Sequence, residues 1–230
     1  MNRVRFTDLG SIDYKEAWDL QQDIFSKVQA TKKNDQGQRD GNFSQTLIFC
    51  EHPHVYTLGR NGKANNLLIN DQFLSRINAG YFETDRGGDI TYHGPGQLVG
   101  YPIFDLESMK IRVKEYIWLL EESIISFLKG YGIDSERFEG ATGVWIEPGN
   151  KARARKICAI GVRVSRYVTM HGFALNINTD LDYFKYINPC GFDDKDVTSL
   201  QKETGTEINM ASVKEQLQDR LAEHFDISWI

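Results

Sequence analysis

The chain has 230 residues and a formal net charge of −5 at pH 7. A hydrophobic fraction of 40% and an aromatic fraction of 12% are ordinary for a soluble globular protein and exclude a disordered chain. The negative charge argues against a nucleic-acid partner, and no apolar run approaches the roughly 18 residues that a membrane span needs. At about 150 residues per domain, this length predicts one large domain or two small ones.

Cysteine usage and the N-terminal sequence indicate the compartment. Cys50, Cys158 and Cys190 are an odd number of cysteines in a long chain, so we expect no disulfide framework and a reducing environment. The first residues, MNRVRFTDLG, lack the apolar stretch of a secretory signal. These features predict a cytoplasmic protein.

The first quarter of the chain predicts a helix followed by strands. Apolar residues recur at helical spacing from Asp13 to Val28, and Asp13 is a suitable N-terminal cap. The polar segment 32–45 contains one hydrophobic residue and is expected to form a loop. Leu47–Cys50 predicts a buried strand, and Val55–Thr57 is expected to extend the same sheet.

The rest of the chain alternates strands with two further helices. Leu98–Tyr101 predicts a strand, and the apolar stripe from Val113 to Leu128 predicts a helix. Three successive strands are expected over residues 144–146, 157–164 and 168–177. A turn near Ser165 would separate the last two, and a final helix follows Asn209. This order predicts a single α+β domain over residues 1–230, with a mixed or mainly antiparallel sheet flanked by helices.

A glycine-rich segment carries residue types that a core does not need. It runs from Arg86 to Gln97 and includes Gly87, Gly88, Asp89, Ile90, Thr91, Tyr92 and His93. Glycines let backbone N–H groups approach a ligand, although a turn-rich connection between strands would look the same. The spacing matches neither a phosphate-binding loop nor the dinucleotide-binding fingerprint.

Two strand segments add further candidates. Lys156 begins an apolar strand that continues through Ala159, Ile160 and Gly161. Such a lysine is usually a surface residue, but one that points into a pocket has a lowered pKa and becomes a possible base. The second strand has Gly172, Phe173 and Ala174 directly after His171. A glycine inside a strand marks a close approach to the backbone, whereas the histidine is equally consistent with a partly buried structural residue.

A cysteine in a turn completes the candidates. Cys190 lies between Pro189 and Gly191, where a thiolate would be accessible, although a lone cysteine is most often a small buried side chain. A second cluster, Cys50 to His54, lacks the paired spacing of metal ligands. We therefore expect no metal site there.

Five motifs in series resemble the lipoyl(octanoyl) transferase family. They are EHPHVYTLGR, RGGDITYHGPGQLVGYP, KICAIGV, HGFALNI and INPCG, and they span roughly Thr46 to Gly191. The resemblance implies a fold similar to the catalytic domains of biotin protein ligases and lipoate–protein ligases. It implies an octanoyltransferase that needs no cofactor. The donor would be octanoyl–acyl carrier protein, and the acceptors would be lipoyl domains of 2-oxoacid dehydrogenases and the glycine cleavage H protein.

The resemblance also implies residue roles. The family's acyl-accepting cysteine is Cys190 here, and its lysine is Lys156. The substrate-contacting stretches correspond to Arg86–His93, Ala159–Gly161 and Gly172–Ala174. We expect the Cys190 thiolate to form an acyl thioester, with Lys156 stabilising the thiolate and acting as general base.

The acyl tail and the donor protein each need a surface. Burying an octanoyl tail is worth roughly 5–6 kcal/mol, and we expect Gly88, Tyr92, His93 and Ala159–Gly161 to line its tunnel. Because acyl carrier proteins are acidic, a basic run without intervening acids predicts a docking face. That run comprises Lys151, Arg153, Arg155, Lys156, Arg163 and Arg166.

Three other functions stay open on the sequence alone. An ATP-dependent lipoate–protein ligase would need a nucleotide-binding loop and would not need Cys190. A non-catalytic binding protein of the same fold is expected to lack Cys190 or Lys156. A cysteine hydrolase would pair Cys190 with His171 or His93 as its base.

Overall fold

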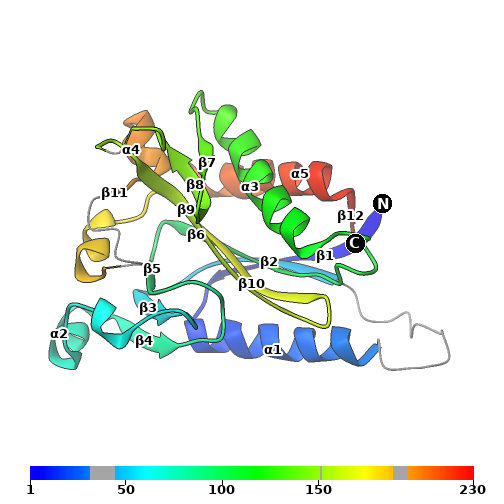
Figure 1. The fold of residues 1–230 in the computed structure, drawn as a ribbon, viewed down its shortest axis with the longest axis horizontal. Helices are drawn as coiled ribbons and strands as arrows, with labels where there is room; N and C mark the ends of the chain where they lie inside the picture. Colours follow the sequence, from blue (N-terminus) through cyan, green and yellow to red (C-terminus); the bar gives the residue numbers. More distant parts are fainter. Residues whose placement is uncertain (32–44, 151, 189–195) are drawn as a thin grey trace.

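The computed structural model describes residues 1–31, 45–150, 152–188 and 196–230 (Figure 1). Its helices are α1 (Tyr14–Thr31), α2 (Asp71–Arg76), α3 (Val113–Lys129), α4 (Leu200–Thr204) and α5 (Met210–Phe225), with 3-10 turns η1 (Ala64–Asn66) and η2 (Leu181–Tyr186). Its strands are β1 (Asn2–Ser11), β2 (Gln45–Glu51), β3 (Val55–Leu58), β4 (Gly80–Glu83), β5 (Thr91–His93), β6 (Gln97–Ile103), β7 (Glu136–Phe138), β8 (Ala141–Ile146), β9 (Arg155–Ser165), β10 (Val168–Asn176), β11 (Asp196–Val197) and β12 (Ile227–Trp229). None of these helices is long and apolar enough to cross a membrane.

Nine of the described strands form one mixed sheet. Its order is β12-β1-β2-β6-β10-β9-β8-β7, and β11 pairs with β9 outside this path. β1 runs parallel to both β12 and β2, and β11 runs parallel to β9, whereas the pairs from β2 to β7 are antiparallel. The predicted α+β fold with a mixed sheet is therefore confirmed.

Helices cover both faces of the main sheet (Figure 1). On one face, α3 and α5 contribute Leu120 and Leu217 to the core that contains Leu175 of β10. On the other face, α1 contributes Ala17 and Phe25 to a second core. Because both faces are covered, β6 and β10 are buried along their whole length. Strands buried in this way form a rigid frame for any site that opens beside them.

A second, three-stranded sheet of order β4-β3-β5 lies beside the main one. The prediction that Val55–Thr57 extends the main sheet is wrong, because β3 pairs with β4 and β5 instead. The chain leaves the main sheet after Glu51 and passes Pro53, which has no N–H to continue the ladder. This break carries the glycine-rich segment away from β2 and over β9.

The other predicted elements are confirmed with small changes of length. The first helix continues to Thr31, and Asp13 caps it by accepting a hydrogen bond from the Lys15 N–H at 2.8 Å. The predicted turn lies at Arg166 and Tyr167, whose φ values of 50° and 62° are left-handed. β1 and β12 were not predicted. The loop expected over 32–45 lies outside the described residues, apart from Gln45, which begins β2.

Candidate active site

A cavity of about 500 Å³ opens between the glycine-rich segment, β9 and β10. Its walls come from elements that are far apart in the sequence and that the two sheets bring together. Lys156 lines it, and so do all the predicted binding residues except Tyr92. These lining residues are Arg86, Gly87, Gly88, Asp89, Ile90, Thr91, His93, Ala159, Ile160, Gly161, Gly172, Phe173 and Ala174.

Small residues of β9 and β10 form the floor of the cavity. Ala159 pairs with Ala174, and Gly161 pairs with Gly172. A Cβ atom on Gly172 would lie only 2.1 Å from the carbonyl oxygen of Gly100. The close approach that the sequence predicted at Gly172 is therefore made by the neighbouring strand β6. Because these positions carry a methyl group or no side chain, room remains above the floor.

The glycine-rich segment is held against β9 through its backbone. The N–H of Gly87 donates to the carbonyl oxygen of Val162 at 2.9 Å. A Cβ atom on Gly161 would lie 2.8 Å from the carbonyl oxygen of Gly87, so the two segments can approach only because this residue is a glycine. Arg86 is buried, and its Nη2 donates to the carbonyl oxygen of Thr57 at 2.6 Å. That bond ties the segment to the small sheet.

Tyr92 and His93 point to opposite sides of β5, as neighbours in a strand do. The Tyr92 ring stacks on Tyr183 at 5.0 Å, and its hydroxyl shares a hydrogen bond with His54 Nδ1 at 2.8 Å. The expectation that Tyr92 lines the tunnel is therefore not met. His93 does line the cavity, and its Nδ1–H donates to Gln97 Oε1 at 2.8 Å. Burial lowers the pKa of His93 to about 3, so its ring is neutral at pH 7.

Lys156 stands at the start of β9 and faces the cavity. Its Nζ lies 4.6 Å from the centroid of the Trp145 ring, a distance at which the ring attracts a cation. The N–H of Thr198 donates to the Lys156 carbonyl oxygen at 2.9 Å, so β11 runs directly beside it. Asp196 and Val197 of β11 line the same cavity. Lys156 therefore lines the cavity and does not take the surface position that is usual for a lysine at the start of an apolar strand.

Cys190 lies outside the described residues, within the segment 189–195. The residues on the two sides of that segment are described, and both sides reach the cavity. Ile187 precedes it and Asp196 follows it, and each lines the cavity together with Lys156. The chain therefore leaves one cavity wall before Cys190 and rejoins another wall after it.

Asn66 joins the glycine-rich segment to the chain that leads toward residue 189. Its Nδ2 donates to Asp89 Oδ2 at 2.7 Å, and its carbonyl oxygen accepts from the Asn188 N–H at 2.8 Å. The sequence analysis did not single out Asn66, because an asparagine in a short turn carries no distinctive pattern. Asn66 can be recognised only from the tertiary structure, which places Asp89 and Asn188 beside it.

The remaining cysteines are structural. Cys50 and Cys158 are free and fully buried, and burial raises the pKa of both thiols. Beside Cys50, the Nδ1–H of His52 donates to the Ile12 carbonyl oxygen at 2.8 Å, and the Tyr101 hydroxyl donates to His52 Nε2 at 2.7 Å. Across the described ranges, no three His, Cys, Asp or Glu side chains gather as a metal ion requires.

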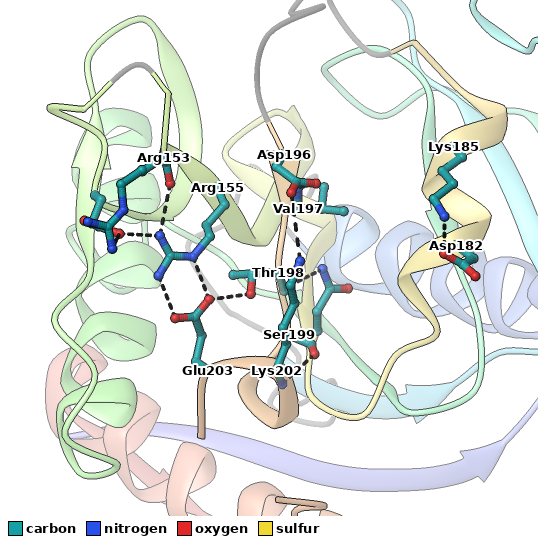
Figure 2. Close-up of polar contacts among 12 residues, drawn as sticks. Arg153, Arg155, Asp182, Lys185, Asp196, Val197, Thr198, Ser199, Lys202 and Glu203 are labelled. Carbon is teal, nitrogen blue, oxygen red and sulfur yellow. Dashed lines mark hydrogen bonds and ion pairs between the residues drawn. The ribbon is translucent and has the colours of Figure 1, made fainter. Parts of the chain in front are cut away.

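The basic run does not form the open cationic face that its sequence predicted. Figure 2 shows Arg155 enclosed by polar contacts, and its Nε and Nη2 donate to the two carboxylate oxygens of Glu203 at 2.6 and 2.7 Å. Its Nη1 donates to Glu147 at 2.5 Å. Arg163 forms an ion pair with Asp85. These acids lie outside the run in sequence, and only the tertiary fold brings them to it.

Two residues of the run remain exposed. The side chain of Arg153 is 66% exposed, although one of its nitrogens lies 3.2 Å from Glu147. Arg166 is exposed in the turn between β9 and β10. Lys151 lies outside the described residues. Arg153 and Arg166 lie beyond opposite ends of β9, so they do not form one face, and Arg153 is the exposed described arginine at the end that carries Lys156.

His171 and Asp85 form a pair at the cavity wall. The Nε2–H of His171 donates to Asp85 Oδ1 at 2.7 Å, and His171 Nδ1 meets no partner among the described residues. Burial lowers the pKa of His171, and the hydrogen bond from this ring lowers the pKa of Asp85. A neutral ring beside an ionised carboxylate results. The sequence analysis considered His171 as a partly buried structural residue or as a hydrolase base, and it missed Asp85, which no motif marks.

Two residues that line the cavity were predicted only as parts of ordinary secondary structure. Tyr14 was counted as one apolar position of the first helix, and Tyr101 as part of a buried strand. Both line the cavity, and their side chains are 2% and 3% exposed. A tyrosine hydroxyl at an otherwise apolar position was the one signal in the sequence that could have suggested a place beside the cavity.

Comparison with known proteins places the chain in a family. The family model of the lipoyl protein ligase A/B catalytic domain matches residues 13–222. The chain is 57% identical over 211 residues to the octanoyltransferase of Bacteroides fragilis strain YCH46, a match that covers 92% of this chain and 93% of the relative. It is 52% identical over 230 residues to the octanoyltransferase of Cytophaga hutchinsonii, which covers 97% and 93% of the two chains.

Solved structures show the same fold at low sequence identity. A bi-partite lipoate protein ligase from Thermoplasma acidophilum has a TM-score of 0.69 at 15% identity, and the match covers 100% of this chain and 86% of the other. The biotin protein ligase of Aquifex aeolicus has a TM-score of 0.50 at 11% identity, covering 98% and 70%. The predicted likeness of fold to these two kinds of ligase is confirmed.

Proposed function

The chain belongs to the lipoyl protein ligase A/B catalytic domain family and is an acyltransferase, and from this premise we propose that it transfers an octanoyl group from octanoyl–acyl carrier protein to a lysine of a lipoyl domain. One observation carries the proposal. Lys156 faces a cavity to which the chain contributes residues on both sides of the segment that contains Cys190. The octanoyltransferase relatives support octanoyl as the acyl group that is transferred.

Two displacement steps balance the reaction. In the first, the Cys190 thiolate attacks the thioester carbonyl carbon, a new C–S bond forms, and the acyl carrier thiol leaves and takes up a proton. In the second, the acceptor lysine amine attacks the enzyme thioester, an amide bond forms, and the Cys190 thiolate leaves. A thioester is converted to an amide, so the reaction runs downhill without ATP.

Lys156 would serve both steps. Free cysteine titrates near 8.5 and free lysine near 10.4, so an unassisted pair of reactants is mostly protonated at pH 7. In its charged form Lys156 stabilises the Cys190 thiolate, and in its neutral form it accepts the proton that the incoming amine loses. The Trp145 ring beside Nζ supplies an apolar wall that restricts the lysine to the cavity side.

The cavity floor suits an alkyl tail. Ala159, Ala174 and the two paired glycines present no bulky side chains, and Phe173 and Ile160 add apolar wall. Each buried methylene is worth about 0.8 kcal/mol, so an octanoyl tail has enough burial energy to be selected by its length.

The proposed partners follow from the same reaction. Lipoyl domains of 2-oxoacid dehydrogenases and the glycine cleavage H protein would provide the acceptor lysines. An acidic acyl carrier protein would dock near Arg153, at the end of β9 that carries Lys156. Because an oxidised Cys190 could not accept an acyl group, we place the enzyme in the reducing cytoplasm.

Intact mass spectrometry tests the covalent step. The protein is mixed with octanoyl–acyl carrier protein in the absence of ATP, and its mass is measured before and after a lipoyl domain is added. We expect a gain of one octanoyl group that disappears as octanoyl-lysine forms. Cys190→Ser should show no adduct, whereas Cys158→Ser should retain it, because Cys158 is fully buried. Transfer without any adduct would disprove the thioester intermediate, and a strict need for ATP would favour a ligase.

A further inference from the structure

The cavity has a reactive end and an inner end. Lys156, Trp145 and Asp196 mark the reactive end. Along β9, Gly161 lies five residues beyond Lys156, which is about 17 Å of strand. Gly161 pairs with Gly172, and beneath α1 the inner end is closed by the buried side chains of Tyr14, His93 and His171. An acyl tail attached at the reactive end would therefore extend over the alanine and glycine floor toward this closed end.

Tyr14 lies across the inner end. Helix α1 packs against β10 there. The ring centroids of Trp18 and His171 lie 6.3 Å apart, and Gln21 Oε1 accepts a hydrogen bond from the backbone N–H of His171 at 3.1 Å. Tyr14 is one helical turn before Trp18, and it lines the cavity with a side chain that is only 2% exposed. The helix thus delivers one aromatic ring to the closed end.

The Tyr14 ring is fixed by the aromatic side chains around it. It stacks on His93 with a centroid distance of 5.9 Å and an angle of 12° between the ring planes. The rings of His52 and Phe82 lie 5.3 Å away on other sides. No described residue hydrogen-bonds the Tyr14 hydroxyl, which fits a hydroxyl that faces the cavity. A ring held in this way cannot move aside for a longer ligand at low cost.

We infer that Tyr14 closes the acyl subsite and sets the longest tail that the enzyme accepts. This inference rests on the proposed octanoyl transfer. The octanoyl tail occupies the floor up to the Tyr14 ring, and a decanoyl or dodecanoyl tail would collide with it. Removal of the ring should extend the subsite beneath α1, since the volume of the ring, rather than its hydroxyl, sets the limit.

Acyl-chain competition tests the inference. Wild type, Tyr14→Leu, Tyr14→Ala and Tyr14→Phe are given octanoyl-, decanoyl- and dodecanoyl-acyl carrier protein with a lipoyl-domain acceptor. The ratio of decanoyl to octanoyl kcat/KM is measured within each protein, so partial loss of folded enzyme cancels. We expect the ratio to rise about tenfold or more in Tyr14→Leu and Tyr14→Ala, because two methylenes gain space. In Tyr14→Phe it should stay at the wild-type value.

Trp18→Phe is the matched control, since Trp18 lies on the same helix but does not line the cavity. Its ratio should equal that of wild type. An unchanged ratio in Tyr14→Leu would overturn the inference, and so would loss of transfer for all three chain lengths in a variant that remains folded by circular dichroism. Failure of the proposed function looks different: wild type itself would transfer no octanoyl group from the carrier protein.

Discussion

Arg155 and Glu203 form a bidentate ion pair that joins β9 to α4. The side chains are only 20% and 14% exposed, and Thr198 donates to the same carboxylate at 2.5 Å. Figure 2 shows the Glu203 carboxylate in contact with both the Arg155 guanidinium and Thr198. Arg155 directly precedes Lys156, so the pair anchors the strand end that carries the cavity lysine.

Removal of this pair should destabilise the protein. We expect Glu203→Gln to lower the free energy of unfolding by about 1.5–3 kcal/mol, because a partly buried guanidinium loses the bidentate one of its two charged acceptors and keeps only Glu147. Urea unfolding measures the change. Arg153→Gln is the control, since the exposed Arg153–Glu147 contact should contribute less than about 0.5 kcal/mol. Equal losses in the two variants would contradict an anchoring role for Glu203.

Docking of the donor should depend on Arg153, which is exposed and lies three residues before Lys156. Reversal of this charge in Arg153→Glu should raise KM for octanoyl–acyl carrier protein severalfold at low salt, and the difference should shrink as salt screens the charges. Steady-state transfer at two ionic strengths measures this. Arg3→Glu on β1, four strands away from β9 in the sheet, controls for the change of net charge. An equal rise of KM in Arg3→Glu would argue against a local docking face.

The free energy of unfolding should fall in acid, because His93 is buried in its neutral form. Between pH about 3 and 6.5, an unfolded His93 binds a proton that the folded one does not, since burial lowers the folded pKa to about 3. The unfolded state therefore binds more protons, and stability declines by about 1.4 kcal/mol for each unit that the pH falls below 6.5. Urea unfolding from pH 7 to pH 5 measures the slope. His93→Gln should lower this slope by about 1.4 kcal/mol per pH unit, which corresponds to one proton. An unchanged slope would show that His93 is not the group responsible.

Alkylation should separate the three cysteines. Burial shields Cys50 and Cys158 and raises the pKa of both thiols, so we expect native protein to take up iodoacetamide at Cys190 alone. Peptide mass mapping locates the label. Protein alkylated at one site should no longer form the octanoyl adduct. Rapid labelling of Cys158 in folded protein would mean that its strand opens and that it competes as a nucleophile.

The sequence alone predicted most of the secondary structure. The helices from Asp13 and Val113 have apolar residues at helical spacing, and the strands around residues 98, 144, 157 and 168 are short apolar runs bounded by turns. It failed at Val55–Thr57, where a short apolar run does not indicate which sheet it joins. It also missed β12, whose three residues pair with β1 from the other end of the chain. Pairing between distant segments leaves no local pattern.

What the sequence by itself determined was a set of segments whose residue types and order indicate acyl transfer. The predicted site residues supply fourteen of the thirty-one that line the cavity, and they include the glycines and alanines that are required where strands and loops approach closely. The tertiary structure decided how these residues face one another. It turned Tyr92 away from the cavity and His93 into it, because neighbours in a strand point to opposite faces. It placed Glu203 and Asp85 on arginines that looked free, and Tyr14 at the end of the subsite, because side-chain partners are set by packing across long sequence separations.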